Sequence, residues 1–314
     1  MKFKQNVLFI VVDDLRPALG CYEDGMAYTP NIDRLAERSV IFKNAYAQCI
    51  YFNTVAVIVA IIGISSNHSD DQPYSWSEEP YHPPTQQFKN ARVCHQPDGS
   101  IKQAIVCPVE VELQPGQSLP DLQSLQEAVK FLNTWPSASS KSFFLAVGFH
   151  KPHIPLKYPR KYRAHVRPFA MPTVAWNPWT DLREREDIAA LNVSFPFGPM
   201  PGWSMAEHGE WAKYSNFDIA LRVPFILHVP GLTNVGKTYN AAFASTDVLV
   251  ELVDLLPSLA DLAGLSKVPL CPQNSTHILL CTEGTSIAPL LQDMANKMAL
   301  LLDILCCNSD FFVS

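Results

Sequence analysis

The chain has 314 residues, of which 47% are hydrophobic and 17% are charged, and its formal net charge is -6. An apolar content this high can fill a hydrophobic core, which excludes wholesale disorder. The 24 basic residues are outnumbered by 30 acidic ones and form no basic block, so nucleic acid is excluded as a partner.

The first segment with a clear pattern is NVLFIVV, residues 6–12. A continuous run rich in β-branched side chains is typical of a strand buried on both faces of a parallel sheet. Asp13 and Asp14 follow it directly. The run is too short for a signal peptide and no small-residue cleavage site follows it, so we expect no signal peptide in this sequence.

Pro30 opens an amphipathic helix over residues 31–39, and residues 40–48 predict another extended segment. Residues 65–116 are rich in Pro, Tyr, His and Asp and show little periodicity. They predict long, structured surface loops.

Regular structure returns with a predicted helix over residues 121–135 and a predicted buried strand over 143–149. Residues 223–229 predict a further strand, and residues 247–265 predict a long helix that Gly264 terminates. Strands that alternate with helices indicate an α/β fold with a largely parallel central sheet flanked by helices. No stretch reaches the roughly 20 apolar residues of a membrane span, so we expect none.

The eight cysteines and the glycosylation sequons favour an oxidising, secretory compartment. Cys94 and Cys107 bracket one polar loop, and Cys271 and Cys281 bracket another. Reduced structural thiols are the alternative interpretation of these four. Sequons for N-glycosylation lie at three positions, Asn67, Asn192 and Asn274.

Asp13 and Asp14 are candidate metal ligands, because ligands of open α/β sheets bind beyond the carboxyl ends of strands. Adjacent carboxylates repel each other unless a cation lies between them. Hard divalent cations prefer oxygen ligands, so Ca²⁺ or Mg²⁺ is the expected ion. A solvated acidic turn or a helix N-cap is the alternative.

The segment His150-Lys151-Pro152-His153 follows the predicted strand 143–149, so its side chains should reach the same rim as the aspartates. A metal, a lysine and a histidine together suit a tetrahedral oxyanion: the first two neutralise its charge and the third donates a proton to a leaving oxygen. A proline-ordered loop is the alternative. A further polar cluster precedes strand 223–229 and contains Glu207, His208, Lys213 and Asp218; a plain polar loop is its alternative.

Long segments of the chain resemble the sulfatase family of the alkaline-phosphatase-like superfamily. They cover most of residues 5–290 in family order and comprise NVLFIVVDDLRPALGCY, TPNIDRLAERSVIFKNAYAQ, GISSNHSDDQPYSWS, FFLAVGFHKPHIP, AWNPWTDLREREDIAALNVSFPFGP, EHGEWAKYSNFD and VELVDLLPSLADLAGL. The resemblance implies a sulfatase-type α/β fold and a lysosomal or secretory glycoprotein. It also implies hydrolysis of sulfuric esters, specifically the 2-sulfate of iduronate in heparan and dermatan sulfate.

The resemblance assigns roles to individual residues. It implies that Asp13 and Asp14 bind a catalytic Ca²⁺, that Lys151 and His153 belong to the active site, and that Lys213 contacts the sulfate. It further implies two disulfides, Cys94 with Cys107 and Cys271 with Cys281. In active relatives the formylglycine-generating enzyme oxidises the cysteine of a C-x-P-S-R motif, and the hydrated product attacks sulfur with help from the metal.

The sequence departs from the family at the nucleophile. C-x-P-S-R should follow AYAQ, but Cys49 is followed by Ile50-Tyr51-Phe52 and an apolar tract. We therefore expect that Cys49 is not modified, that no nucleophile is present and that the chain as it stands is inactive. The Asp-His pair expected before Gly202 is missing too, so the sequence predicts an internally truncated fold.

These departures define the predicted organisation. Residues 1–293 form a sulfatase-like domain with an atypical insert at 50–62 and a missing segment near residue 200, and residues 294–314 form a tail unlike the family.

Two other functions stay open. One is a non-catalytic sulfatase-like glycoprotein or inactive isoform that binds sulfated glycans through Lys151, His153 and Lys213. The other is a phosphatase or phosphodiesterase of the same superfamily, for which Thr54 is the candidate nucleophile.

Overall fold

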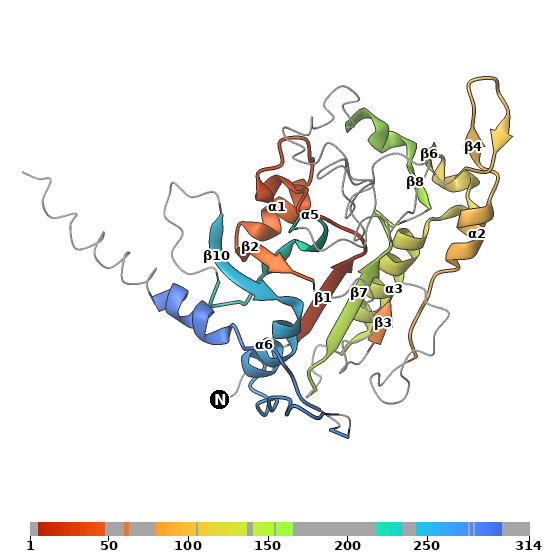
Figure 1. Ribbon diagram of the computed structural model, residues 1–314. Coiled ribbons are helices and arrows are strands. Elements are labelled where there is room, and N and C mark those ends of the chain that lie inside the picture. The colour runs from red at the N-terminus through yellow and green to blue at the C-terminus, as the bar shows by residue number, and fades with distance from the viewer. Residues whose placement is uncertain are drawn as a thin grey trace, which may run out of the picture. The chain divides into compact units, whose positions relative to one another are not determined.

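The computed structural model describes residues 6–47, 60–62, 79–104, 106–136, 141–153, 155–165, 218–233, 243–275, 277–278 and 280–296. The chain divides into two compact units, which are formed by residues Met1–Leu15 with Phe52–Ser215 and by Arg16–Tyr51 with Asn216–Ser314. Both units contain a small β-sheet with helices beside it (Figure 1). The α/β class predicted from the sequence is therefore confirmed.

The sheet of the first unit has the strand order β1-β7-β3 and is parallel throughout. Its strands are β1 (Val7–Val12), β7 (Phe144–Phe149) and β3 (Ala60–Ile62). The register pairs Val12 with Phe149, so β1 and β7 end at the same level. Helix α3 (Pro120–Thr134) packs on β7, where Ala128 meets Leu145 and Val147.

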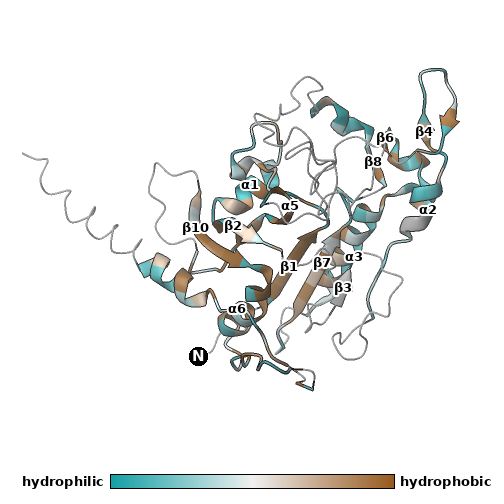
Figure 2. Cartoon of the chain, viewed as in Figure 1, coloured by the Kyte–Doolittle hydropathy of each residue, from teal (hydrophilic) through white to brown (hydrophobic). Residues whose placement is uncertain are grey.

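The apolar face that β7 buries under α3 continues across β1 without the same cover. Leu8 and Ile10 are in register with Leu145 and Val147, yet they are 50% and 49% exposed. Figure 2 shows β1 as one of the most hydrophobic strands of the chain. The prediction that residues 6–12 are buried on both faces is therefore wrong, because the helix that covers β7 leaves the neighbouring strand half open.

Around the first disulfide lies a small substructure of the first unit, here named the disulfide lobe. Its elements are α2 (Thr85–Asn90), the antiparallel pair β4 (Cys94–His95) and β5 (Ile101–Lys102), and the parallel pair β6 (Val106–Val109) and β8 (Leu156–Pro159). The 3-10 helices Val111–Leu113, Pro115–Gln117 and Arg160–His165 adjoin it.

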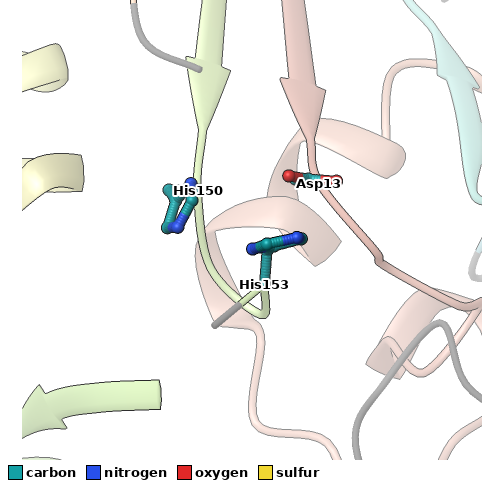
Figure 3. A group of neighbouring side chains, drawn as sticks. All are labelled: Asp13, His150 and His153. Carbon is teal, nitrogen blue, oxygen red and sulfur yellow. The ribbon is translucent and has the colours of Figure 1, made fainter. Parts of the chain in front are cut away.

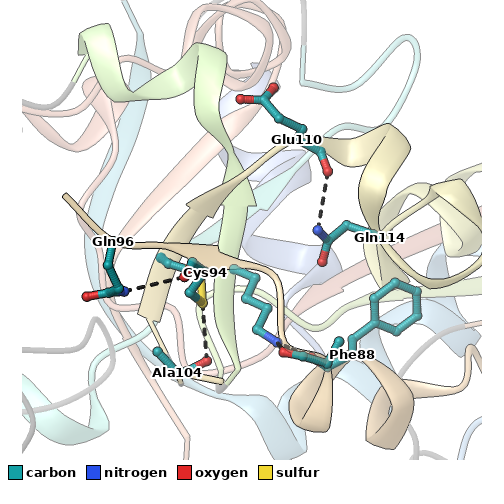
Figure 4. Close-up of a disulfide and its surroundings, with 9 residues drawn as sticks. Phe88, Cys94, Gln96, Ala104, Glu110 and Gln114 are labelled. Atoms are coloured by element: carbon teal, nitrogen blue, oxygen red, sulfur yellow. Dashed lines mark hydrogen bonds between the residues drawn. A yellow bond between two sulfur atoms is a disulfide. The ribbon is translucent and has the colours of Figure 1, made fainter. Parts of the chain in front are cut away.

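A core holds the disulfide lobe together. The Cys94–Cys107 bond, with an S–S distance of 2.03 Å, is buried beside Phe88, Val109 and Leu119 (Figure 4). The prediction of surface loops for residues 65–116 is thus wrong for the described part from residue 79 onward. A disulfide and a few apolar side chains order short elements that show no periodicity in the sequence.

The sheet of the second unit has the order β10-β2-β9. Strand β10 (Ala244–Glu251) pairs parallel with β2 (Val40–Tyr46), whereas β9 (Phe225–Leu227) pairs antiparallel with it. Phe42, Val250 and Leu291 are among the residues buried against this sheet. Tyr22 fastens the antiparallel pair, because its hydroxyl accepts the Phe225 N–H at 2.7 Å and lies 3.0 Å from the Phe42 carbonyl.

The helices of the second unit are short. They include the 3-10 helix Gly20–Tyr22, α1 (Pro30–Ala36), α5 (Asp218–Leu221) and α6 (Leu255–Leu262), and residues 288–296 are also helical. Helix α1 confirms the predicted helix after Pro30, although it ends three residues earlier. None of the helices that the structure describes has the length and apolarity needed to cross a membrane.

The long helix predicted over residues 247–265 is wrong in its first part. Strand β10 continues to Glu251, a 3-10 turn covers Leu252–Asp254, and only then does α6 begin. The run Val248-Leu249-Val250 suits a strand as well as a helix, and pairing with β2 decides between them. The predicted stop is in place, because Gly264 adopts a left-handed φ of 67° just after α6.

Candidate active site

The backbone of the site follows from the pairing of β1 with β7. Asp13 comes directly after β1 and donates its N–H to the Phe149 carbonyl at 3.0 Å, which extends the ladder by one bond. His150 comes directly after β7, and the His153 N–H donates to the His150 carbonyl at 2.8 Å to close a turn. The ends of two neighbouring parallel strands thus present the acidic and the cationic segments side by side.

Asp121, at the start of α3, holds the backbone of that turn. One carboxylate oxygen accepts the His150 N–H at 2.6 Å and the other accepts the Lys151 N–H at 3.1 Å. Burial raises the pKa of Asp121, while these two N–H donors and the Lys151 charge counteract the rise. Asp121 is not predictable as a site residue from the sequence, since an acidic residue in a first helical turn indicates only a helix terminus.

Lys151 is the most perturbed cation of the site. Burial lowers its pKa to about 8, although the carboxylates of Asp121 and Asp13 pull it upward. Within the described part of the chain its Nζ is buried and has no hydrogen-bond partner. A buried amine that lacks a partner is costly to stability, so it marks a place where an anionic ligand would be bound favourably.

Asp13, His150 and His153 form a group whose ligand atoms all lie within 4.8 Å of one another. Figure 3 shows the three side chains around the ends of β1 and β7. The two imidazole rings are 4.9 Å apart between centroids. This arrangement could hold a metal ion, and His150 is the member that the sequence analysis did not name as a ligand, although the spacing His-x-x-His was a visible signal.

Asp14 is not part of that group. Its Oδ2 lies 4.0 Å from the Nε2 of His153, its side chain is only 9% exposed, and its backbone has a left-handed φ of 61°. Of the predicted site residues, the structure therefore brings Asp13, Asp14, Lys151 and His153 to one place.

Several other predicted residues lie outside the described residues, namely Lys213, Cys49, Thr54, Asn67 and Asn192. The predicted tail 294–314 is described only as far as residue 296. Asn274 is exposed, and the nearby disulfide Cys271–Cys281 has an S–S distance of 1.97 Å. Both disulfides join the cysteines that the family resemblance implies. Asp218, from the third polar cluster, lies in the second unit, where it accepts a hydrogen bond from Tyr46.

An α/β fold that gathers metal-ligating and cationic side chains beyond its strand ends is typical of enzymes that act on esters of tetrahedral oxyanions. Comparison with known proteins narrows this class. The family model described as Sulfatase matches residues 5–85, and the chain is 37% identical to iduronate 2-sulfatase of Mus musculus over 408 residues. That alignment covers 91% of this chain and 74% of the relative. The chain therefore belongs to the sulfatase family, whose members hydrolyse sulfuric esters.

Solved structures agree on the fold. Phosphonate monoester hydrolase from Silicibacter pomeroyi matches with a TM-score of 0.60 at 15% identity, covering 92% of this chain and 77% of its own. A 2-O GAG sulfatase matches with a TM-score of 0.52 at 19% identity, covering 93% and 75%. The alignment with the mouse relative runs over 408 residues, which is longer than the 314 residues of this chain.

Proposed function

We propose that this site binds the 2-sulfate of iduronate in heparan or dermatan sulfate, and that the chain as it stands does not hydrolyse it. The observation that carries the proposal is the Lys151 amine, which is buried beside His153 without a hydrogen-bond partner in the described part of the chain. The choice of substrate is supported by the 37% identity to iduronate 2-sulfatase.

The charged Lys151 amine can donate a charge-assisted hydrogen bond to a sulfate oxygen. His153, at the end of the same turn, is placed to donate a proton to the leaving sugar oxygen in a catalytically complete relative. Asp121 keeps both in position through the backbone N–H groups of His150 and Lys151. Lys213 would provide a second cationic contact to the sulfate.

The missing component is the nucleophile. Cys49 is not followed by the Pro-Ser-Arg of C-x-P-S-R, so the formylglycine-generating enzyme has no motif to modify. Without the formylglycine hydrate no covalent sulfate intermediate forms, and binding would end without turnover.

Calcium is the ion that the family resemblance implies for Asp13 and Asp14. Ca²⁺ takes six to eight oxygen ligands. The described side chains gathered with Asp13 are instead two imidazoles, and Asp14 stands outside that group. The described residues therefore do not fit calcium, and no step of the proposed function depends on it.

A lysosomal or secretory location follows from the same family assignment. Two disulfides and an exposed asparagine in the sequon Asn274-Ser275-Thr276 support it, because disulfides and N-glycans form in the secretory pathway.

Purified protein tests both halves of the proposal. An iduronate 2-sulfate disaccharide should release no sulfate, and mass spectrometry of the peptide around Cys49 should show an unmodified thiol. Sulfate release that a chelator abolishes would overturn the claim of inactivity.

Binding is tested on immobilised heparan sulfate, from which the protein should elute with rising salt. Lys151→Gln should elute at markedly lower salt. Lys130→Gln is the matched control, since Lys130 lies exposed on α3 and pairs with Glu127. Equal elution of the two variants, or no retention of the unmodified chain, would rule out the binding site.

A further inference from the structure

We propose that the 3-10 helix Arg160–His165, here named the basic helix, is a second contact site for the sulfated polysaccharide, separate from the active site. Its sequence Arg-Lys-Tyr-Arg-Ala-His contains three cations and no acidic residue. The inference rests on the proposed function, because it takes the same polymer as its ligand, but it uses none of the residues of the active site.

The charge of the chain is unevenly distributed. The whole chain has a net charge of -6, yet residues 85–117 and 156–165, which form the disulfide lobe and its 3-10 helices, contain seven lysines and arginines against three aspartates and glutamates. Four of those seven cations lie within residues 157–165. A local excess of positive charge on an acidic protein attracts a polyanion to this part of the surface and not to the molecule as a whole.

The basic helix is anchored at its first residue. Arg160 forms an ion pair with Glu110, and the register that pairs Pro159 with Val109 brings the two side chains together. Lys161 and Arg163 are exposed and, within the described part of the chain, form no ion pair. Arg160 therefore holds the helix in place, while the other two cations are available to a ligand.

An aromatic ring lies beside one of these cations. Side chains three positions apart eclipse in a 3-10 helix, and the rings of Tyr162 and His165 lie 6.3 Å apart between centroids. The Lys161 Nζ is 5.1 Å from the centroid of the Tyr162 ring, and Tyr162 is 51% exposed. A flat aromatic face can pack against a sugar ring, and an ammonium group beside it can donate to a sulfate. This combination favours a sulfated sugar over a simple anion.

One continuous segment leads from the active site to the basic helix. The turn His150–His153 precedes β8, and the basic helix begins at the residue after β8. Seven positions separate His153 from Arg160, so the two sites are at most about 25 Å apart. Because β8 alone spans about 10 Å, we expect a disaccharide held at Lys151 to end before the basic helix and a long chain to reach both sites.

The test compares a short ligand with a long one on the full chain. Binding of the iduronate 2-sulfate disaccharide is measured by calorimetry, and binding of heparan sulfate chains on a sensor surface at several salt concentrations. The double variant Lys161→Ser/Arg163→Ser should bind the chains about fivefold to tenfold more weakly and with a smaller salt dependence, because two exposed cations are lost. Its affinity for the disaccharide should equal that of the parent.

Two further variants separate the basic helix from general charge. Lys89→Ser/Lys102→Ser removes the same charge from exposed positions on α2 and β5 of the same lobe, and it should bind the chains nearly as the parent does. Tyr162→Ala keeps every charge and should weaken binding of the chains about threefold without a change in salt dependence. Circular dichroism confirms that each variant is folded before its affinity is compared.

Equal losses in the two double variants would overturn the proposal, because the polymer would then respond to the charge of the lobe as a whole. So would a loss of disaccharide affinity in the Lys161→Ser/Arg163→Ser variant, which would show that the two sites are not separate. Nucleic acid is the other polyanion to consider, and competition by single-stranded RNA as effective as that by heparan sulfate would also reject a polysaccharide site. If instead Lys151→Gln leaves disaccharide affinity unchanged, the proposed function fails and the basic helix is judged from the chains alone, so the two failures are distinguishable.

Discussion

Lys151 and Lys157 lie six residues apart in the first unit, and burial lowers the pKa of both. Their surroundings differ. Lys157, in β8, is 1% exposed and donates to two backbone carbonyls, those of Phe88 and, at 3.0 Å, of Ala91. Lys151 has two carboxylates in its vicinity but no hydrogen-bond partner for its amine in the described part of the chain.

The two lysines show how a structural amine differs from a ligand-binding amine. The carbonyls at the end of α2 have no helical partners, and Lys157 satisfies them from the neighbouring strand. Its charge is therefore used within the fold. Burying the Lys151 amine is also costly, and among the described residues it donates to no acceptor, so its benefit must come from something that binds there.

The largest expected effect is at Lys157. Lys157→Met would leave the Phe88 and Ala91 carbonyls without their donor, and we expect a loss of about 4 kcal/mol in the free energy of unfolding. Urea denaturation followed by circular dichroism measures it. Lys102→Met, on the exposed strand β5, should change little. A loss below about 1 kcal/mol would mean that the amine is not structural.

The disulfide lobe that Lys157 supports should come next. Replacing Cys94 and Cys107 with serine opens a loop of 13 residues and should cost about 3 kcal/mol, since the unfolded chain gains freedom. Differential scanning calorimetry in oxidising buffer should show the lower melting temperature. If a reductant lowers the melting temperature of this variant as much as that of the parent, the Cys94–Cys107 bond contributes little to the stability of the lobe.

Lys151→Met should act in the opposite direction. The folded-state pKa is about 8, below the ordinary value of 10.5, so below pH 8 the charged amine is buried at a cost. Methionine removes that cost, and we expect a gain of about 2 kcal/mol at pH 7 together with weaker heparan sulfate binding. Between pH 8 and 10.5 the unfolded chain holds the proton that the folded chain has lost, so the parent becomes more stable as pH rises. The variant should lack this rise, and urea titrations at pH 7 and 10 compare the two.

The smallest effect concerns the pH dependence of glycan binding. Because Lys151 loses its charge near pH 8, retention on heparan sulfate should weaken as pH rises through that value. Retention measured from pH 6.5 to 9.5 at constant salt checks it. The Lys151→Met variant should show a flatter profile, and identical profiles would place the titrating group elsewhere.

The sequence was sufficient for the features that depend on local pattern. Apolar runs predicted β1 and β7, and the residues just after them correctly located Asp13, Lys151 and His153 at one rim. It was insufficient where a distant partner decides the outcome. Strand β10 exists because β2 pairs with it, and Asp121 matters because it reaches His150 across 29 positions. Short-range periodicity in the sequence gives no information about such distant partners.

The prediction for the disulfide lobe was wrong for a related reason. Its strands have two to four residues, so they are too short to show a period, and their order comes from the Cys94–Cys107 bond and the carbonyls that Lys157 satisfies. Two pairs of cysteines in the sequence indicated where disulfide bonds could form but not which elements those bonds enclose.

The parallel pairing of β1 with β7 has a consequence for biosynthesis. Residues 7–12 leave the ribosome long before residues 144–149, which are their partners, and β2 likewise waits for residues 225–227 and 244–251. During that interval two apolar strands have neither partner nor cover. Contacts so distant in sequence form slowly, and exposed strand edges are sites of aggregation. The yield of folded chain should therefore be controlled by chaperones that protect the first fifty residues until the last strand is made.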